Sequence, residues 1–129
     1  MTVYPADLKY DKEHEWVRVE GSEAVVGISD FAQDQLGEVV YVDLPAVGDE
    51  LVAGETFGEI ESVKSVSELY APITGTVLEV NDELGNTPET INSDPYAAGW
   101  MIKVSVADAS QIDGLMSAED YESFVANEA

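Results

Sequence analysis

Alternating polar and apolar side chains mark the first part of the chain. The alternation runs through residues 15–20, and an apolar run at residues 24–28 follows Gly21 and Ser22. A period of two is typical of half-buried β-strands, and Gly-Ser between two such runs is typical of a tight turn. The pattern therefore predicts a β-hairpin over residues 15–29.

A glycine-led strand pattern then occurs twice, at residues 37–44 and 75–81, and Asp-Glu-Leu follows each copy, at residues 49–51 and 82–84. Such self-similarity predicts two related β-layers packed face to face, and two copies are too few for a solenoid. Residues 100–106 add a further predicted strand. We therefore expect a mainly β fold, a small pseudo-symmetric β-sandwich.

Helix signals are short and lie at the margins of this pattern. Asp30 is expected to cap a helix of under two turns that ends at Gly37. A turn of helix with Pro88 at its first position is expected later in the chain. Ser117 with Asp120 three positions on resembles a capping box and predicts a C-terminal helix. The helices are therefore expected to be peripheral.

The segment between the two copies, residues 57–70, contains the only lysine between Lys12 and Lys103, namely Lys64. Its apolar side chains recur at every third position, a step that drifts around a helix instead of forming one stripe. The segment fits better as two strands joined by a turn at Lys64 and Ser65. Lys64 is therefore predicted at the tip of a hairpin.

The predicted register places apolar residues opposite each other, Val63 with Val66 and Ile60 with Leu69. The turn contains neither glycine nor asparagine, which argues against the primed turns that most two-residue hairpins use. An ordinary turn and a longer loop both stay open. On spacing alone, the simpler interpretation of Lys64 is a solvated lysine that discourages edge pairing.

Acidic residues outnumber basic ones by 27 to 5 among the 129 residues, for a formal net charge of -22. The resulting negative field opposes binding to nucleic acid and to acidic membranes, so neither is expected as a partner. With 45% hydrophobic residues the chain can bury a core, and one domain over residues 1–129 is expected. In so acidic a chain, a lysine kept between two repeats favours a dedicated role.

The chain has no cysteine, which excludes disulfides, thiolate metal sites and cysteine nucleophiles. His14 is the only histidine and builds no common zinc or triad site, so it is expected to be structural, or to line a groove beside an aromatic ring. No nucleophile-elbow or phosphate-loop pattern is present. We therefore expect a non-catalytic protein, and a monomer. Because the N-terminus lacks the pattern of a signal peptide, we expect it to be cytoplasmic.

Several segments, in order along nearly the whole chain, carry a family resemblance. The central segment runs from Glu61 to Ser65 and continues to Gly75, and the others lie at residues 9–10, 14–17, 26–30, 36–40, 92–96 and 99–103. Together they resemble the H proteins of the glycine cleavage system. The resemblance implies a barrel-sandwich hybrid fold of the lipoyl or biotinyl type.

The resemblance also implies a carrier that catalyses no step itself. In the family, glycine decarboxylase, which uses pyridoxal phosphate, loads an aminomethyl group and two electrons onto a lipoyl disulfide. An aminomethyltransferase then passes the carbon to tetrahydrofolate, and dihydrolipoyl dehydrogenase, with FAD and NAD, reoxidises the dithiol. A lipoate ligase or lipoyl transferase is implied as the modifying enzyme.

The resemblance assigns lipoate to Lys64, in amide linkage. The surface that the modifying enzyme recognises is then Glu61, Ser62, Val63 and Ser65. In this family the loaded arm folds back into a groove, to which we assign His14, Glu15 and Glu68. Two alternatives stay open, since the acidic residues could simply be charged surface and Glu68 could belong to the recognition surface instead.

Other functions compete with this one. A lipoyl domain of a 2-oxoacid dehydrogenase would share the turn and the repeat, but the segment around His14 and Trp16 would be unexpected in it. A biotin carrier usually has methionine on both sides of its lysine, whereas Val63 and Ser65 flank Lys64. A lipoyl donor that serves other enzymes and an unmodified interaction module stay open as alternatives.

The acidity predicts a dependence on salt. Because carboxylates repel one another in the compact state, we expect screening cations to stabilise the fold, as in a salt-rich, halophilic cytoplasm. The midpoint of thermal unfolding should rise between low salt and molar potassium chloride. An unchanged midpoint would favour the alternative, in which the acidic surface serves to dock a more basic partner.

Overall fold

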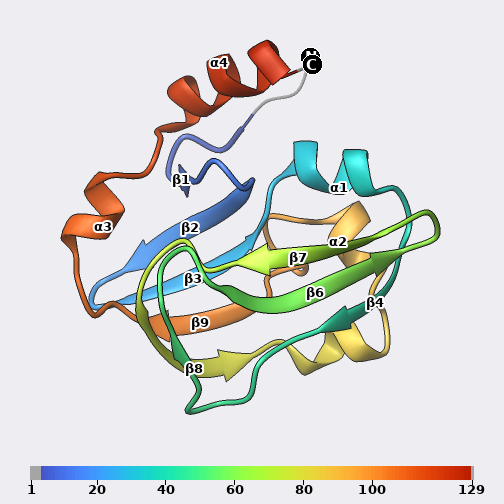
Figure 1. The fold of residues 1–129 in the computed structure, drawn as a ribbon, viewed down its shortest axis with the longest axis horizontal. Helices are drawn as coiled ribbons and strands as arrows, with labels where there is room; N and C mark the ends of the chain where they lie inside the picture. Colours follow the sequence, from blue (N-terminus) through green and yellow to red (C-terminus); the bar gives the residue numbers. More distant parts are fainter. Residues whose placement is uncertain (1–3, 129) are drawn as a thin grey trace.

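The computed structural model describes residues 4–128 of the protein. Two antiparallel sheets lie against each other (Figure 1), with strand orders β1-β2-β3-β9-β8-β5 and β4-β6-β7. The strands are β1 Lys9–Tyr10, β2 Glu15–Glu20, β3 Glu23–Ile28, β4 Val39–Asp43, β5 Glu50–Leu51, β6 Thr56–Ser62, β7 Val66–Tyr70, β8 Gly75–Val80 and β9 Ile102–Ser105. The helices are α1 Asp30–Leu36, the 3-10 helix η1 Asp82–Gly85, α2 Thr90–Ser93, α3 Ser110–Asp113 and α4 Ala118–Glu128. The mainly β fold with short helices is confirmed.

The first predicted hairpin is present as β2 and β3. Their pairing runs from Glu15 opposite Ile28 to Glu20 opposite Glu23, so that Gly21 and Ser22 form the turn, as predicted. Gly21 has a φ of 67°, in the left-handed region that a glycine adopts without strain. The alternation of the sequence therefore fixed both the strands and their register.

The two glycine-led copies lie in different sheets, β4 in the smaller and β8 in the larger. The Asp-Glu-Leu that follows the first copy enters β5, which pairs with β8 through Glu50 opposite Thr76 and Leu51 opposite Gly75. The Asp-Glu-Leu of the second copy forms η1, which contacts β4. The segment after each copy thus contacts the other copy, β5 as a strand of the larger sheet and η1 as a helix beside β4.

The core lies between the two sheets. It is built from apolar side chains that both sheets and the connecting segments bury, including Val17, Val26, Ile28, Val39, Ile60, Leu69, Ile73, Val77, Met101, Ile102 and Val104. Burial of apolar area on this scale supplies the main driving force for folding. The hairpin of β6 and β7 buries its inward side chains here and extends beyond the body at the right-hand edge of Figure 1.

Several predicted boundaries shift by one or two residues. Ser29, not Asp30, caps α1, because its Oγ accepts the Ala32 N–H at 3.2 Å; Asp30 instead accepts a hydrogen bond from Gln33 Nε2 at 2.8 Å. The predicted end of α1 at Gly37, where φ is 81°, is confirmed. The helical turn predicted to start at Pro88 starts two residues later, as α2. The strand predicted over residues 100–106 is shorter in the structure, where it is β9.

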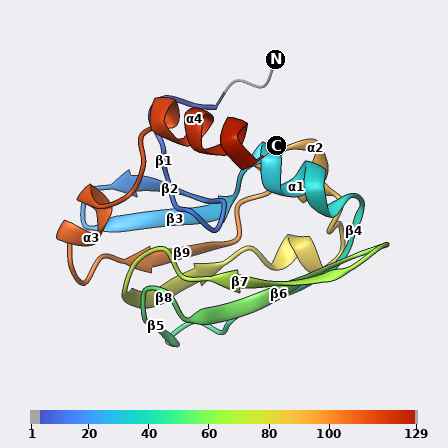
Figure 2. The ribbon, with the colours of Figure 1, turned by 45° about the horizontal axis from the view of Figure 1, so that its top comes forward.

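The C-terminal helix α4 begins as predicted, with Ser117 Oγ accepting the Asp120 N–H at 3.2 Å. It lies across β1 and β2, at the opposite end of the molecule from β6 and β7 (Figure 2). A second, aromatic-rich core fills the space beneath it, made of Tyr4, Leu8, Tyr10, Trp16, Val25, Tyr121 and Val125. No helix among the described residues is long and apolar enough to cross a membrane.

Tyr121 joins α4 to the rest of the fold. Its ring stacks on that of Tyr10, with centroids 4.6 Å apart, and its hydroxyl lies 2.6 Å from Ser29 Oγ and 2.8 Å from His14 Nδ1. Burial raises the pKa of this phenol above its ordinary value of 10.0, so the hydroxyl keeps its proton. The α4 helix is therefore tied to the loop before β2 and to the start of α1.

Replacing Tyr121 with Phe should lower the free energy of unfolding by about 1–2 kcal/mol, because Ser29 and His14 lose a buried hydrogen-bond partner while the ring packing stays. Urea denaturation measures the effect. The matched control is Tyr41→Phe, at an exposed tyrosine on β4. Equal stability of the two variants would show that the hydroxyl contributes nothing.

Candidate functional site

Lys64 lies at the tip of the β6–β7 hairpin, but the predicted register is wrong. The pairs are Glu61 opposite Val66 and Ile60 opposite Ser67, and Ser62 N donates to Ser65 O at 2.8 Å. The two central residues of the turn are therefore Val63 and Lys64. The prediction failed because it paired apolar with apolar, whereas Ile60 and Leu69 bury their side chains against the core while Val63 and Val66 are 67% and 57% exposed.

Ser62 holds the turn together. Its buried hydroxyl donates to Ser65 O at 3.2 Å and accepts the N–H groups of Ser65 at 3.1 Å and Lys64 at 3.4 Å. The Val63 N–H donates to the carbonyl oxygen of Glu38, 3.0 Å away in the segment before β4. His14 is the only non-glycine residue with positive φ among those described, so this turn is not a primed one. The backbone beside Lys64 is therefore held from two sides.

The Lys64 side chain is exposed, and it forms no ion pair with any side chain that the structure describes. Its stem passes over Gly37, where a Cβ atom would lie 3.3 Å from Lys64 Cε. A side chain at Gly37 would also be strained, since φ there is 81°. Gly37 thus ends α1 and leaves room for the lysine stem.

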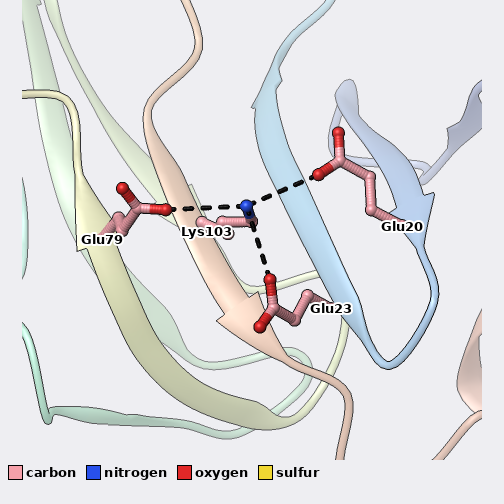
Figure 3. A network of polar contacts seen from close by, with 4 residues as sticks. All are labelled: Glu20, Glu23, Glu79 and Lys103. Carbon is pink, nitrogen blue, oxygen red and sulfur yellow. Dashed lines mark ion pairs between the residues drawn. The ribbon is translucent and has the colours of Figure 1, made fainter.

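Lys103 gives the contrast (Figure 3). Its Nζ lies 3.4 Å from Glu23, 3.5 Å from Glu20 and 3.6 Å from Glu79, across three strands of the larger sheet. The hydrogen bond to Glu23 and the nearby carboxylates raise the pKa of Lys103. Lys103 is therefore paired with carboxylates of its own sheet, whereas the Lys64 amine pairs with no described carboxylate.

A groove of about 690 Å³ opens beside the hairpin, between α1, β7 and the loop that precedes β2. It brings together the three residues assigned to it from the sequence, His14, Glu15 and Glu68, and Ser65, next to Lys64, also lines it. The remaining lining residues are Glu13, Ile28, Phe31, Ala32, Gln35, Leu36, Ile60, Ser67, Leu69 and Tyr70. The α1 side of the groove is mostly apolar, and the three glutamates of the lining all lie on the other side.

Glu15 is the buried acid of this groove, with 2% of its surface exposed. Its Oε1 has no hydrogen-bond partner among the described residues. Burial, and after it the carboxyl group of Asp11, raise the pKa of Glu15 well above 4.5, while the backbone N–H of Tyr70 opposes the shift. A buried acceptor without a partner is costly, so this oxygen is suited to a cationic or hydrogen-bonding ligand.

His14 packs against aromatic rings and also lines the groove. Its ring packs against Phe31, with centroids 5.0 Å apart, and against Tyr121 and Phe124. Its φ of 73° places it in the left-handed region, and its backbone bonds to Asp11 and to Ser29. His14 therefore shapes the loop as well as lining the groove, so the two predicted roles coexist.

Glu68 lies on β7, exposed at the side of the groove, where its Oε2 accepts a hydrogen bond from the Tyr70 hydroxyl at 3.0 Å. That bond raises the pKa of Tyr70. Glu68 is paired across the hairpin with Glu59, away from the turn contacts of Ser62. By position it belongs with the groove more than with the tip.

Sequence reasoning missed Asp11, Glu38 and Tyr121. Asp11 Oδ1 accepts the N–H groups of Glu13 and Glu15, which is the pattern of an Asx turn; an aspartate four residues before Glu15 was the available signal. Glu38 acts through its carbonyl oxygen, and no side-chain pattern reports such a contact. The role of Tyr121 depends on the docking of α4, which the local sequence does not encode.

A model of the family described as glycine cleavage H-protein matches residues 8–128 of this chain. The chain belongs to this family. A glycine cleavage system H protein of Carboxydothermus hydrogenoformans is 52% identical over 128 residues, covering 99% of this chain and 98% of its own. One from Anaeromyxobacter sp. (strain K) is 59% identical over 121 residues, covering 94% of each.

The structural comparison agrees. The crystal structure of a glycine cleavage system H protein from Mycobacterium marinum matches with a TM-score of 0.88 and 38% identity, covering 95% of this chain and 99% of that one. As an H protein, the chain is a carrier component of the glycine cleavage system and is not itself catalytic, as the resemblance implied. Family membership also supports a lipoyl carrier role.

Replacing Glu15 with Gln should stabilise this H protein near pH 7 by roughly 1–2 kcal/mol and have little effect near pH 5. The folded protein keeps a proton on Glu15 that the unfolded chain releases above its ordinary pKa of 4.5. The contribution of Glu15 to stability is therefore complete below that pH and is lost as the pH rises toward the folded pKa.

Urea denaturation of the wild type and of Glu15→Gln, each at both pH values, measures this difference. The control is Glu61→Gln, at an exposed glutamate of β6. The same stability difference at the two pH values would contradict the raised pKa of Glu15.

Proposed function

We propose that Lys64 carries lipoate in amide linkage and that the protein conveys the aminomethyl group of glycine from glycine decarboxylase to the aminomethyltransferase. Electrons pass on to dihydrolipoyl dehydrogenase. The observation that carries this proposal is the environment of Lys64, an exposed amine on a turn held by Ser62 and Glu38, beside a groove of about 690 Å³. Family membership supports the same role.

The residues around Lys64 fit a tethered prosthetic group. When attached, the lipoyl group supplies a disulfide that takes up the aminomethyl group and two electrons together. The chain itself has no cysteine, so it contains no thiol that could exchange with that disulfide. Amide formation removes the charge of Lys64, and since no described carboxylate pairs with this amine, its loss breaks no ion pair.

We assign recognition by the lipoate ligase or lipoyl transferase to the turn and its flanks, namely Glu61, Ser62, Val63 and Ser65. Ser62 sets the backbone shape through its hydroxyl, and Val63 is 67% exposed next to the amine. Glu61 lies on the exposed face of the smaller sheet, between Tyr41 and Val66 in one cross-strand row. An apolar side chain, an acid and a fixed turn together form a surface that an enzyme can recognise specifically.

The groove is proposed to hold the cargo between enzymes. Glu15 offers a buried acceptor and Glu68 an exposed carboxylate to the ammonium end of the cargo, while Phe31, Leu36 and Ile60 cover its apolar part and exclude water. Partners that bind so acidic a protein are expected to present basic surfaces. The cytoplasmic location and the monomeric state stay predictions.

The intact mass of the protein from its native host tests the attachment. We expect a lipoyl increment that is absent from Lys64→Ala. Ser62→Ala should keep Lys64 but slow its modification by about tenfold, because the turn loses the hydroxyl that holds it. Ser67→Ala, on the same hairpin, is the matched control. A protein without the increment would contradict the carrier role.

A further inference from the structure

Asn92 of α2 makes three hydrogen bonds to the segment that leads from the last turn of α1 into β4. Its Oδ1 accepts the Val39 N–H at 2.8 Å, and its Nδ2 donates to Gly37 O at 2.8 Å and to Gln33 Oε1 at 3.0 Å. A reversed amide would place its oxygen against two other oxygens, so the three bonds also fix the direction of the amide. Residues 92–96 carry part of the family resemblance, but the proposed function gives Asn92 no task.

The peptide group that Asn92 binds also reaches the turn at Lys64. The Val39 N–H and the Glu38 carbonyl belong to one planar peptide group, and since no described peptide bond is cis, they point in opposite directions. Asn92 holds the N–H on one side, and on the other side the Glu38 carbonyl oxygen accepts the Val63 N–H at 3.0 Å. Asn92 therefore sets the direction of the carbonyl that holds the turn.

A second bond of Asn92 acts on the backbone beneath the lysine stem. That stem passes over Gly37, whose carbonyl oxygen accepts Asn92 Nδ2, and a Cβ atom at Gly37 would lie 3.3 Å from Lys64 Cε. The Ser62 hydroxyl supports the turn from within the hairpin, through its bonds to Lys64 and Ser65. Asn92 thus supplies a support from the body of the protein.

The α2 helix does not depend on these bonds for its own position. It lies beside the end of α1 (Figure 1, Figure 2), and Ile91, next to Asn92, is fully buried in the core between the sheets. Burying an isoleucine side chain stabilises a fold more than the net gain of one hydrogen bond does. Loss of the Asn92 amide should therefore leave α2 folded and change what the amide holds.

We infer that Asn92 is a positioning residue for Lys64, which orients the peptide group between Glu38 and Val39 so that the turn keeps the shape in which the modifying enzyme accepts the lysine. The inference rests on the proposed function, since it assumes that Lys64 is lipoylated. A simpler role, in which Asn92 only joins α2 to α1, needs no more than the bond to Gln33. The other two bonds lie on either side of Glu38.

The kinetics of a lipoate ligase acting on the unmodified protein, with lipoate and ATP, test this role. Without the amide, the turn has the accepted shape for only a fraction of the time, so KM for the protein rises by the inverse of that fraction while kcat stays unchanged. We expect Asn92→Ala to raise KM by about tenfold, the size expected for one lost hydrogen bond. An unchanged KM, or a loss confined to kcat, overturns the inference.

Two matched variants accompany this measurement. Gln33→Ala removes only the bond that joins α2 to α1, and Asn86→Ala changes an exposed asparagine after η1. Both should keep the wild-type KM. If Gln33→Ala raises KM as much as Asn92→Ala does, joining the two helices explains the effect and the inference is overturned.

Val63→Pro supplies a rescue, because proline presets the φ of this turn residue and has no N–H for the Glu38 carbonyl to hold. Val63 has no positive φ, and Ser62 before it ends a β-strand, so both positions accept the change. In this background Asn92→Ala should raise KM by less than about twofold, whatever Val63→Pro itself does to recognition. A rise as large as in the wild-type background would overturn the inference, since Asn92 would then act elsewhere.

Amide hydrogen exchange, followed by NMR in the unmodified protein, reports on the turn without any modification. The Val63 N–H should exchange about tenfold faster in Asn92→Ala, because its bond to Glu38 O opens more easily, while the Ile60 N–H of the same hairpin keeps its rate. Unchanged exchange at Val63 overturns the inference and leaves the carrier role standing. A native protein without a lipoyl group would overturn the carrier role, and with it the task of Asn92, even where the exchange shows that Asn92 holds the turn.

Discussion

The turn at Val63 and Lys64 has to be held from outside, and much of the site depends on that constraint. Neither residue favours a tight turn, so the backbone is fixed by the Ser62 hydroxyl and by the carbonyl oxygen of Glu38. Glu38 follows Gly37, which ends α1 and accommodates the lysine stem. The hairpin tip, the end of α1 and one wall of the groove are therefore a single connected unit.

The opposite wall is built on the loop that precedes β2. Here the positive φ of His14 and the Asx turn of Asp11 place Glu15 against the groove, and Tyr121 from α4 holds the histidine in place. A rigid scaffold on both sides suits a carrier, because the cargo must be held and then released without any chemistry from the protein. The buried acid costs stability in the empty protein and is suited to a cation.

The sequence predicted much of the fold for identifiable reasons. Alternation with a period of two gave β2, β3 and the turn between them, since one face of that hairpin is buried. The glycine-led copies indicated the two layers. The start of α1 was predicted one residue late, because Ser29 and Asp30 are equally good caps by residue type. The register of β6 with β7 was predicted wrongly, because the contacts of Ser62 and Glu38 decide it, and not apolar residues facing each other.

By itself, then, the sequence determined the β-sandwich pattern, the isolation of Lys64 at a hairpin tip and membership of the H-protein family, because periodicity, punctuation and motif order are local properties. Only the tertiary structure brought His14, Glu15 and Glu68 to one groove beside Ser65. Those contacts join the loop before β2, the β7 strand and the α1 helix. Their proximity comes from sheet packing and helix docking, which no local pattern encodes.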